Sequence, residues 1–258
     1  MDKLTKLWDP KKGVMKIAGL MSGSGSNLVK IIEHEQKLKD ERGFSPYHVA
    51  VIFSDNPKSN AVKIGSDFAL PVFTFDLEAY CRKIQADVKD MKAREDYEKN
   101  VINVINQFEC PVFAYAGYMR KATELFVNSA IGVNIHPADL SIVDKKGKRE
   151  YTGDKAVLKA LKAGEKEIRS TTHLITSKVD NGPLLMVSRP VKIDYPISDD
   201  IIIMDMMAKH YQNSLKTTGD WEIFPKTLEY IAEGRYAKDI KGRLYFDEVP
   251  IFNGVRLD

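Results

Sequence analysis

The chain has 258 residues, 43% of them hydrophobic and 29% charged, and its formal net charge is +3 at pH 7. This length and composition allow a sizeable core, and the near-neutral charge balance gives no reason to expect binding to nucleic acid or to a membrane surface. The two cysteines, Cys81 and Cys110, form neither a disulfide framework nor a metal-ligand pattern. No signal peptide and no membrane-spanning run is visible, so we expect a cytoplasmic protein with a single domain over residues 1–258.

The first half of the chain alternates strands and helices. Short apolar runs predict strands at Val14–Met21, His48–Ser54, Pro71–Phe75, Pro111–Ala116 and Ile131–Ile135. Between them, helical patterns begin at Leu28 and extend over Asn60–Phe68 and Glu78–Phe108. This order predicts an α/β fold with a doubly wound, mostly parallel sheet of Rossmann-like type.

The second half departs from this alternation. Helices are expected over Lys155–Ala163, Asp199–Leu215 and Trp221–Glu233, and strands over Thr172–Thr176, Leu184–Ile193 and Leu244–Phe246. Because the two strands before residue 194 follow each other directly, we expect an antiparallel C-terminal extension of the sheet. The basic stretch Lys145–Arg149 is expected to be an exposed loop.

In parallel sheets, ligands bind beyond the carboxyl ends of the strands, which here selects the turns Gly23–Asn27, Ala116–Arg120 and Asn134–Pro137. The glycine turn leaves backbone N–H groups free at a helix N-terminus, which suits an anion such as phosphate. It is not a dinucleotide fingerprint, because Leu28 occupies the third glycine position, and it lacks the lysine of a P-loop. A tight turn that caps a helix explains the same residues equally well.

Asn134 and His136 are two residues apart on a predicted strand, so they point to the same face, and Pro137 ends the strand there. An amide donor beside an imidazole can stabilise an oxyanion and move protons, although a satisfied polar pair at a sheet edge is the alternative. Asp180 would orient the imidazole if it lay close, but turn chemistry alone accounts for Val179–Pro183. No His-x-His or His-Glu-x-x-His spacing occurs, so no metal site is expected.

Taken together, these motifs resemble the folate-dependent formyltransferase family over about residues 14–258. The matching stretches are Ser22–Leu28, Ala116–Arg120, Val133–Pro137, Ser170–His173, Val179–Pro183, Ile223–Pro225 and Ile231–Arg235. The resemblance implies a formyltransferase fold with a phosphate-binding half at about 14–130 and a catalytic and folate-binding half at about 131–258.

The resemblance also implies the roles of individual residues. The implied catalytic residues are Asn134, His136 and Asp180, and the implied phosphate-binding residues are Gly25, Ser26 and Asn27. The implied folate contacts are Met119, Arg120, Ala122, Val127, Thr176 and Val179, and the other implied substrate contacts are Thr171, Lys216 and Asp220. An amine would attack the formyl carbon of 10-formyltetrahydrofolate. The amide and a protonated imidazole would stabilise the oxyanion, and the carboxylate would keep the imidazole charged and relay the amine's proton through water.

Two segments depart from the family pattern, both on the side of the amine. The stretch Ala138–Tyr151 is longer and basic, and Thr217 stands where the family places a phosphate-contacting lysine, with Lys216 adjacent. The expected acceptor is glycinamide ribonucleotide of purine biosynthesis. Another amine such as a nucleotide amino sugar, water as acceptor, and a non-catalytic nucleotide-binding module stay open. We expect small-molecule partners only, in a monomer or homodimer.

Overall fold

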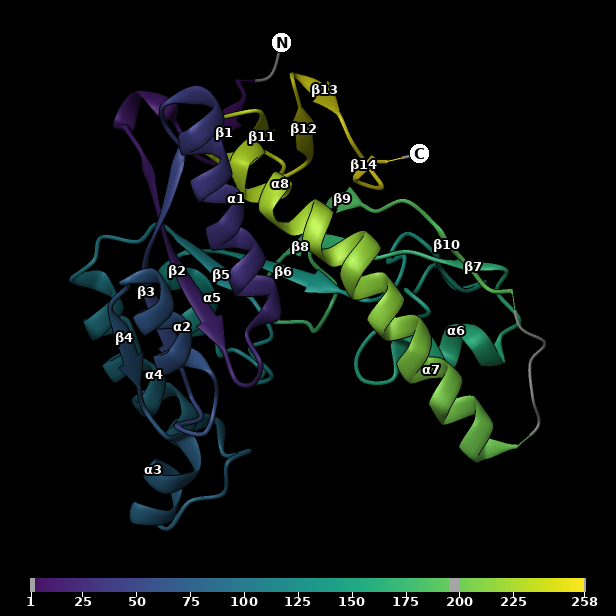
Figure 1. Cartoon of the computed structure of the whole chain (residues 1–258), viewed down its shortest axis with the longest axis horizontal. Helices are drawn as coiled ribbons and strands as arrows, with labels where there is room; N and C mark the ends of the chain where they lie inside the picture. Colours follow the sequence, from purple (N-terminus) through teal and green to yellow (C-terminus); the bar gives the residue numbers. More distant parts are fainter. Residues whose placement is uncertain (1–2, 195–199, 258) are drawn as a thin grey trace. The chain divides into compact units, whose positions relative to one another are not determined.

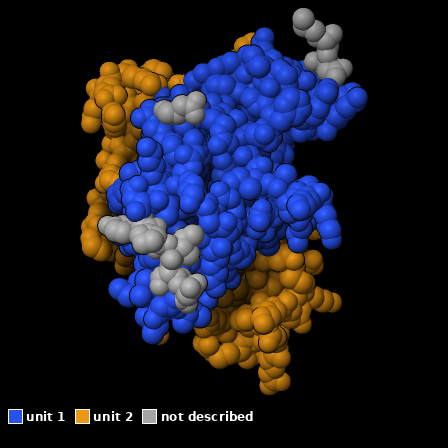
Figure 2. Space-filling view, turned by 90° about the vertical axis from the view of Figure 1, so that its right-hand side faces the viewer, with its two compact units in different colours: residues 1–7, 135–231, 235–258 blue, residues 8–134, 232–234 orange. Residues whose placement is uncertain are grey.

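The computed structural model describes residues 3–194 and 200–257 (Figure 1). The chain divides into two compact units, coloured separately in Figure 2. Unit 2 comprises residues 8–134 and 232–234, and unit 1 comprises residues 1–7, 135–231 and 235–258. The boundary between 134 and 135 falls inside one strand, β6.

Unit 2 is built on a parallel sheet with the strand order β4-β3-β2-β5-β6. Its strands are β2 (Met15–Met21), β3 (Tyr47–Ser54), β4 (Val72–Thr74), β5 (Val112–Tyr115) and β6 (Ile131–His136). The chain moves outward from β2 to β3 and β4 on one side, and through β5 to β6 on the other. This reversal confirms the predicted doubly wound sheet, and it places the topological switch point between β2 and β5.

The helices of unit 2 connect these strands. They are α1 (Ser26–Arg42), α2 (Ala61–Phe68), α3 (Leu77–Lys83), α4 (Met91–Asn106) and α5 (Glu124–Ser129), with a short 3-10 helix, η1 (Pro10–Lys12), before the sheet. Glycine and cap residues set several helix ends. Gly43, for example, ends α1 in the left-handed region with φ 78°.

The single helix predicted over Glu78–Phe108 is instead two helices, α3 and α4. Gln85 has φ 57°, which is incompatible with a continuing helix, and the Asp90 carboxylate accepts hydrogen bonds from the N–H groups of Lys92 and Ala93 to begin α4. Capping chemistry therefore outweighs the helix-favouring composition. Among the apolar residues of this stretch, Tyr97, Val101 and Ile105 in α4 are buried, whereas Ile84 and Met91 near the break are exposed.

Unit 1 contains the antiparallel strands that the sequence predicts. Strand β8 (Thr171–Leu174) pairs antiparallel with β9 (Leu184–Val187), and β14 (Val255–Arg256) pairs parallel with β9. The strand predicted over Leu184–Ile193 ends early at Val187. Its remainder is the separate strand β10 (Val191–Lys192), which pairs antiparallel with β7 (Glu167–Ile168).

A further antiparallel sheet of unit 1 joins the two ends of the chain in the order β1-β11-β12-β13. Its strands are β1 (Thr5–Lys6), β11 (Tyr236–Lys238), β12 (Leu244–Phe246) and β13 (Val249–Pro250). The predicted strand Leu244–Phe246 is confirmed as β12. Its partners are too short to show a pattern of alternation in the sequence.

The helices of unit 1 are α6 (Ala156–Lys162), α7 (Ile201–Leu215), a π-helical turn η2 (Lys216–Asp220) and α8 (Trp221–Ala232). In Figure 1, α7 and α8 form one nearly continuous helical run, coloured green to yellow. The predicted start of this run at Asp199 lies outside the described residues. Helices α6 and α7 pack together around Leu161, Met204 and Tyr211, which are buried.

Candidate active site

His136 and Asp180 face each other in unit 1. His136 lies at the end of β6 and Asp180 in the loop between β8 and β9, and the distance from His136 Nδ1 to Asp180 Oδ2 is 3.4 Å. The Nε2 atom of His173, from β8, lies 3.5 Å from the other carboxylate oxygen of Asp180. All three side chains are buried. The structure thus gives Asp180 two imidazole neighbours, where the motifs suggested one.

Groups of the short stretch 149–153 hold this pair. The Nε2–H of His136 donates to the carbonyl oxygen of Tyr151 at 2.7 Å, and the N–H of Gly153 donates to Asp180 Oδ2 at 2.7 Å. The Nη1 atom of Arg149 donates to the main-chain oxygen of Asp180 at 2.6 Å. Because a carbonyl oxygen only accepts hydrogen bonds, Nε2 of His136 carries a proton, and Nδ1 is the nitrogen that faces the carboxylate.

The electrostatics of the two groups differ. Burial raises the pKa of Asp180, but the hydrogen bond with His173, the charge of His136 and the Gly153 N–H outweigh burial and lower this pKa to about 2. Burial lowers the pKa of His136 below its ordinary value, and the charge of Asp180 and the Tyr151 carbonyl oppose only part of that effect. Asp180 therefore acts on His136 in the expected direction, but burial of the imidazole is the stronger influence.

Asn134 lies two residues before His136 in the same strand, β6. It is half-buried, and it is in register with Tyr115 of β5. Alternation along the strand gives the side chains of Asn134 and His136 the same face.

Among the other residues of unit 1 that were predicted to contact the substrate, Thr171 and Asp220 form hydrogen bonds within the protein. The Thr171 hydroxyl donates to the carbonyl oxygen of Ala138 at 2.7 Å and accepts from the N–H of Leu140 at 3.1 Å, so it holds the chain that follows His136. The buried carboxylate of Asp220, in η2, accepts from the hydroxyl of Ser170 at 2.6 Å. Lys216 is half-buried at the start of η2.

Thr176 and Val179 lie on the loop between β8 and β9, and both side chains are exposed. The base of this loop is tight. The N–H of Leu174 donates to Pro183 O at 2.9 Å, and a Cβ atom on Gly182 would lie 1.7 Å from the carbonyl oxygen of Leu174. Main-chain contacts therefore hold the base of the loop together, whereas Thr176 and Val179 farther along it are exposed.

The glycine turn of unit 2 requires glycine at residue 25. Gly25 has φ 68°, and a Cβ atom there would lie 2.5 Å from Ile64 Cδ1 and 2.7 Å from Met21 Cε. Ser26 and Asn27 form the first turn of α1, and no side chain accepts a hydrogen bond as its N-cap. N–H groups at a helix N-terminus without a side-chain cap are of the kind that binds anions.

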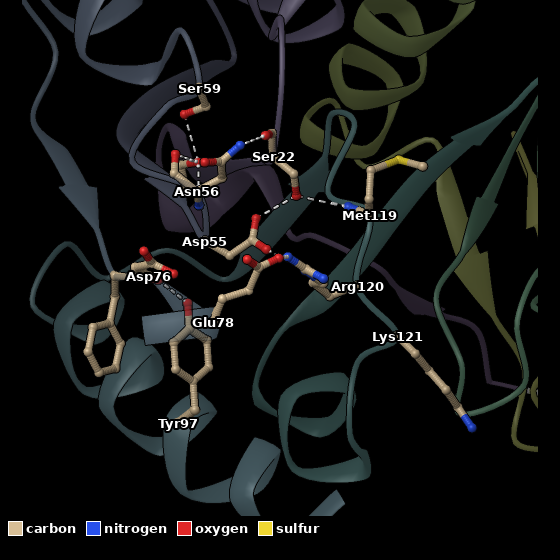
Figure 3. Close-up of polar contacts among 12 residues, drawn as sticks. Ser22, Asp55, Asn56, Ser59, Asp76, Glu78, Tyr97, Met119, Arg120 and Lys121 are labelled. Atoms are coloured by element: carbon tan, nitrogen blue, oxygen red, sulfur yellow. Dashed lines mark hydrogen bonds and ion pairs between the residues drawn. The ribbon is translucent and has the colours of Figure 1, made fainter. Parts of the chain in front are cut away.

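A polar cluster of unit 2 joins the ends of β2 and β3 to the turn after β5 (Figure 3). The Asp55 carboxylate, whose side chain is 0% exposed, accepts from Ser22 Oγ at 2.5 Å and from Arg120 Nε at 2.6 Å. Ser22 Oγ in turn accepts from the N–H of Met119 at 3.0 Å, and Arg120 Nη2 lies 3.3 Å from Glu78. Two carboxylates therefore compensate the charge of Arg120, one of the predicted folate contacts.

The remaining predicted folate contacts of unit 2 follow this turn. Ala122 is buried and Val127 is half-buried in α5. Helix α4 anchors the turn from the other side, because the Glu98 carboxylate accepts from the N–H of Thr123 at 3.1 Å and pairs with Arg94 at 3.2 Å.

Sequence reasoning missed His173, Arg149 and Asp55. His173 falls inside a matching stretch but has no spacing that marks it, and Arg149 belongs to a stretch expected to be a loop. Asp55 follows β3, so the strand-end rule that selected the other turns covers it as well. Within residues 3–194 and 200–257, no group of three or more His, Cys, Asp or Glu side chains is arranged to hold a metal ion. Among the helices of residues 3–194 and 200–257, none combines the length and the hydropathy that a membrane span needs.

The chain is similar to known proteins in its sequence and in its fold. Among curated relatives, the phosphoribosylglycinamide formyltransferase of Escherichia coli (strain K12) is 25% identical over 225 residues, 86% of this chain and 89% of that protein. That of Bacillus subtilis (strain 168) is 27% identical over 181 residues, 69% of this chain and 80% of that protein. The solved phosphoribosylglycinamide formyltransferase from Coxiella burnetii has the same fold, with a TM-score of 0.72 at 22% identity over 95% of this chain and 100% of that one. The sequence profile described as formyl transferase matches residues 15–209, so the chain belongs to the formyl transferase family.

Proposed function

We propose that this chain transfers the formyl group of 10-formyltetrahydrofolate to the amine of glycinamide ribonucleotide, a step of purine biosynthesis. The observation that carries the proposal is the buried pair of His136 and Asp180, which lies inside the family match. The curated relatives named phosphoribosylglycinamide formyltransferase support the acceptor, because the match covers 89% and 80% of their lengths.

In the proposed reaction, His136 offers its Nδ1 atom to the formyl oxygen. Nε2 is committed to Tyr151, whereas Nδ1 lies 3.4 Å from Asp180, longer than the 2.7–3.2 Å of a good hydrogen bond. A protonated Nδ1 can thus donate to the oxygen on which negative charge develops when the amine attacks, and the Asn134 amide adds a second donor. Loss of one such donor costs about 2.7–4 kcal/mol of transition-state stabilisation.

Asp180 has two parts in the proposed reaction. Its charge raises the pKa of His136 above what burial alone would allow, which increases the protonated fraction of the imidazole. Its own low pKa of about 2 keeps it ionised, so it can accept, through water, the proton that the attacking amine loses. That proton then passes to the tetrahydrofolate nitrogen as the bond between this nitrogen and the formyl carbon breaks, and tetrahydrofolate leaves.

For substrate binding, we propose that the N-terminus of α1, at Gly25, Ser26 and Asn27, holds the phosphate. In unit 2 we assign folate contacts to Met119, Arg120, Ala122 and Val127. In unit 1, taken by itself, we assign them to Thr176 and Val179. Arg120 shapes the turn that carries the contacts of unit 2, since Asp55 and Glu78 compensate its charge. The further substrate contacts are Thr171, Lys216 and Asp220. We propose a single formyltransferase domain, located in the cytoplasm and present as a monomer or homodimer.

The test is an acceptor panel. The purified protein is mixed with 10-formyltetrahydrofolate and glycinamide ribonucleotide, a nucleotide amino sugar, or water alone, and release of tetrahydrofolate is followed. We expect turnover with glycinamide ribonucleotide only. Turnover with the amino sugar instead would change the acceptor, and a lack of turnover with every acceptor would refute formyl transfer.

The His136→Ala variant separates an enzyme from a binding module. It should lose turnover while calorimetry shows that it still binds glycinamide ribonucleotide, because the proposed phosphate site lies in the glycine turn. If activity persisted in this variant, the assignment of His136 would be wrong.

A further inference from the structure

Within Ala138–Tyr151, where this chain departs from the family pattern, residues 142–150 fold as a hairpin rather than an open loop. Val143 and Arg149 form an antiparallel bridge, and the N–H of Asp144 donates to the carbonyl oxygen of Lys148 at 2.8 Å. The tip of the hairpin is exposed, but Arg149 is half-buried. The basic residues of this segment therefore occupy two different environments.

Arg149 contacts the main chain of Asp180, not its carboxylate. Its Nη1 atom donates to the Asp180 carbonyl oxygen at 2.6 Å. Asp180 has φ 51°, in the left-handed region, which aspartate adopts more readily than most residues other than glycine. The side chain of Val179 beside it is exposed, so Val179 itself contributes little packing that would hold the backbone in this conformation.

We propose that Arg149 is a positioning residue, whose hydrogen bond fixes the backbone from which the Asp180 carboxylate faces His136. This inference rests on the proposed roles of His136 and Asp180. A guanidinium suits the task because it is permanently charged, and a charge-assisted hydrogen bond is stronger than one between neutral groups. The hairpin that the family pattern lacks would then support the reaction itself rather than only alter the acceptor.

If Arg149 acted only through its charge, its loss would shift the pKa of His136 in the opposite direction to the loss of a positioning residue. The charged and titratable groups that shift the pKa of His136 are Asp180, His173 and Lys159. Loss of a nearby cation would raise the pKa of His136. Release of Asp180 from its position would lower that pKa, because the carboxylate is the neighbour that favours the charged imidazole.

The experiment is an NMR pH titration of the histidine ring protons in Arg149→Ala, Arg149→Lys and Lys148→Ala, with His136 assigned from the His136→Ala spectrum. We expect the pKa of His136 to fall in Arg149→Ala, to fall less in Arg149→Lys, and to stay unchanged in Lys148→Ala. Lys148 is the matched control, since it is the exposed neighbour with the same charge. In the formyl-transfer assay, kcat of Arg149→Ala should fall about tenfold to a hundredfold, as expected for a misplaced catalytic group, with KM for the amine nearly constant.

An unchanged or raised pKa of His136 in Arg149→Ala would overturn the proposal. If that variant does not fold, Arg149→Lys decides the question, because a lysine reaches the carbonyl less well and must lower the pKa to a smaller extent. If the unaltered protein shows no formyl transfer, the proposed function fails, but the titration still decides whether Arg149 positions Asp180.

Discussion

In unit 2 a buried side-chain carboxylate holds the turns at the strand ends, whereas in unit 1 main-chain groups take part in holding both His136 and Asp180. Asp55 ties Ser22 to Arg120, while Tyr151 O and Gly153 N–H hold His136 and Asp180. Where side chains form the scaffold, they also hold backbone groups of the turn, as Ser22 does for the N–H of Met119. Where the main chain forms the scaffold, the side chains stay available for proton transfer. Changes at His136 and Asp180 should therefore alter kcat and its pH dependence, and changes at Asp55 and Gly25 should alter KM and stability.

The largest effect is expected for Asp180→Asn in unit 1. General acid–base groups contribute about 10²–10⁴-fold, so kcat should fall at least about 100-fold. Loss of the carboxylate charge lowers the pKa of His136, which burial already lowers, so the decline of kcat/KM with rising pH should move to lower pH. Rate profiles of the two proteins over pH check this expectation. An unchanged profile would show that His136 does not depend on Asp180.

The counterpart in unit 2 is Asp55→Asn, which leaves Arg120 without its closest carboxylate. Weakening a buried, charged hydrogen-bond partner costs about 1–3 kcal/mol, which urea unfolding measures. KM for the folate should rise, while kcat changes little, because the turn shifts and the catalytic pair does not. Glu78→Gln is the control. Glu78 is exposed and its contact is longer, so its change should cost under about 1 kcal/mol. A large fall in kcat for Asp55→Asn at constant KM would contradict the expectation that the turn around Asp55 affects folate binding rather than catalysis.

A smaller effect on stability is expected for Gly25→Ala. The left-handed conformation costs a residue with a Cβ atom about 1–2 kcal/mol, and the added Cβ atom also meets Ile64 and Met21. The distorted turn should raise KM for the phosphorylated amine and leave KM for the folate nearly unchanged. Gly23→Ala is the matched control, because a Cβ atom there meets nothing within 4 Å and its φ is not in the left-handed range. Equal effects of the two changes would argue against a phosphate site at α1.

The smallest effect is expected for Arg256→Ala, which tests a side-chain anchor in unit 1. Arg256 lies 2.8 Å from Asp139 and its side chain is 37% exposed, so loss of the pair should cost under about 1 kcal/mol. Burial raises the pKa of Asp139, but Arg256 and Ser141 outweigh it and lower that pKa. The stabilisation is therefore present above the ordinary pKa of aspartate and is lost as pH falls. Unfolding curves at neutral and acid pH check this, and a marked fall in kcat would show that unit 1 also depends on side-chain charge.

The longer elements of the fold were accessible to prediction, because apolar runs and cap residues act locally. Strands β2 and β3 and the pair β8–β9 follow from such runs. The break between α3 and α4 could not be read from composition, since both sides favour helix. Two-residue strands such as β7 and β14 exist only through hydrogen bonds to distant partners, and no periodicity marks them.

The sequence by itself determined that Asn134 and His136 share one face, because side chains alternate along any strand and a proline ends this one. The sequence also indicated the turn at Gly25 that precedes α1, because a glycine-rich turn before a helix is a local pattern. Only the tertiary structure decided that Asp180 faces His136. The position of Asp180 depends on a loop between two strands and on hydrogen bonds from Arg149 and Gly153, and contacts between segments far apart in the chain leave no local signal.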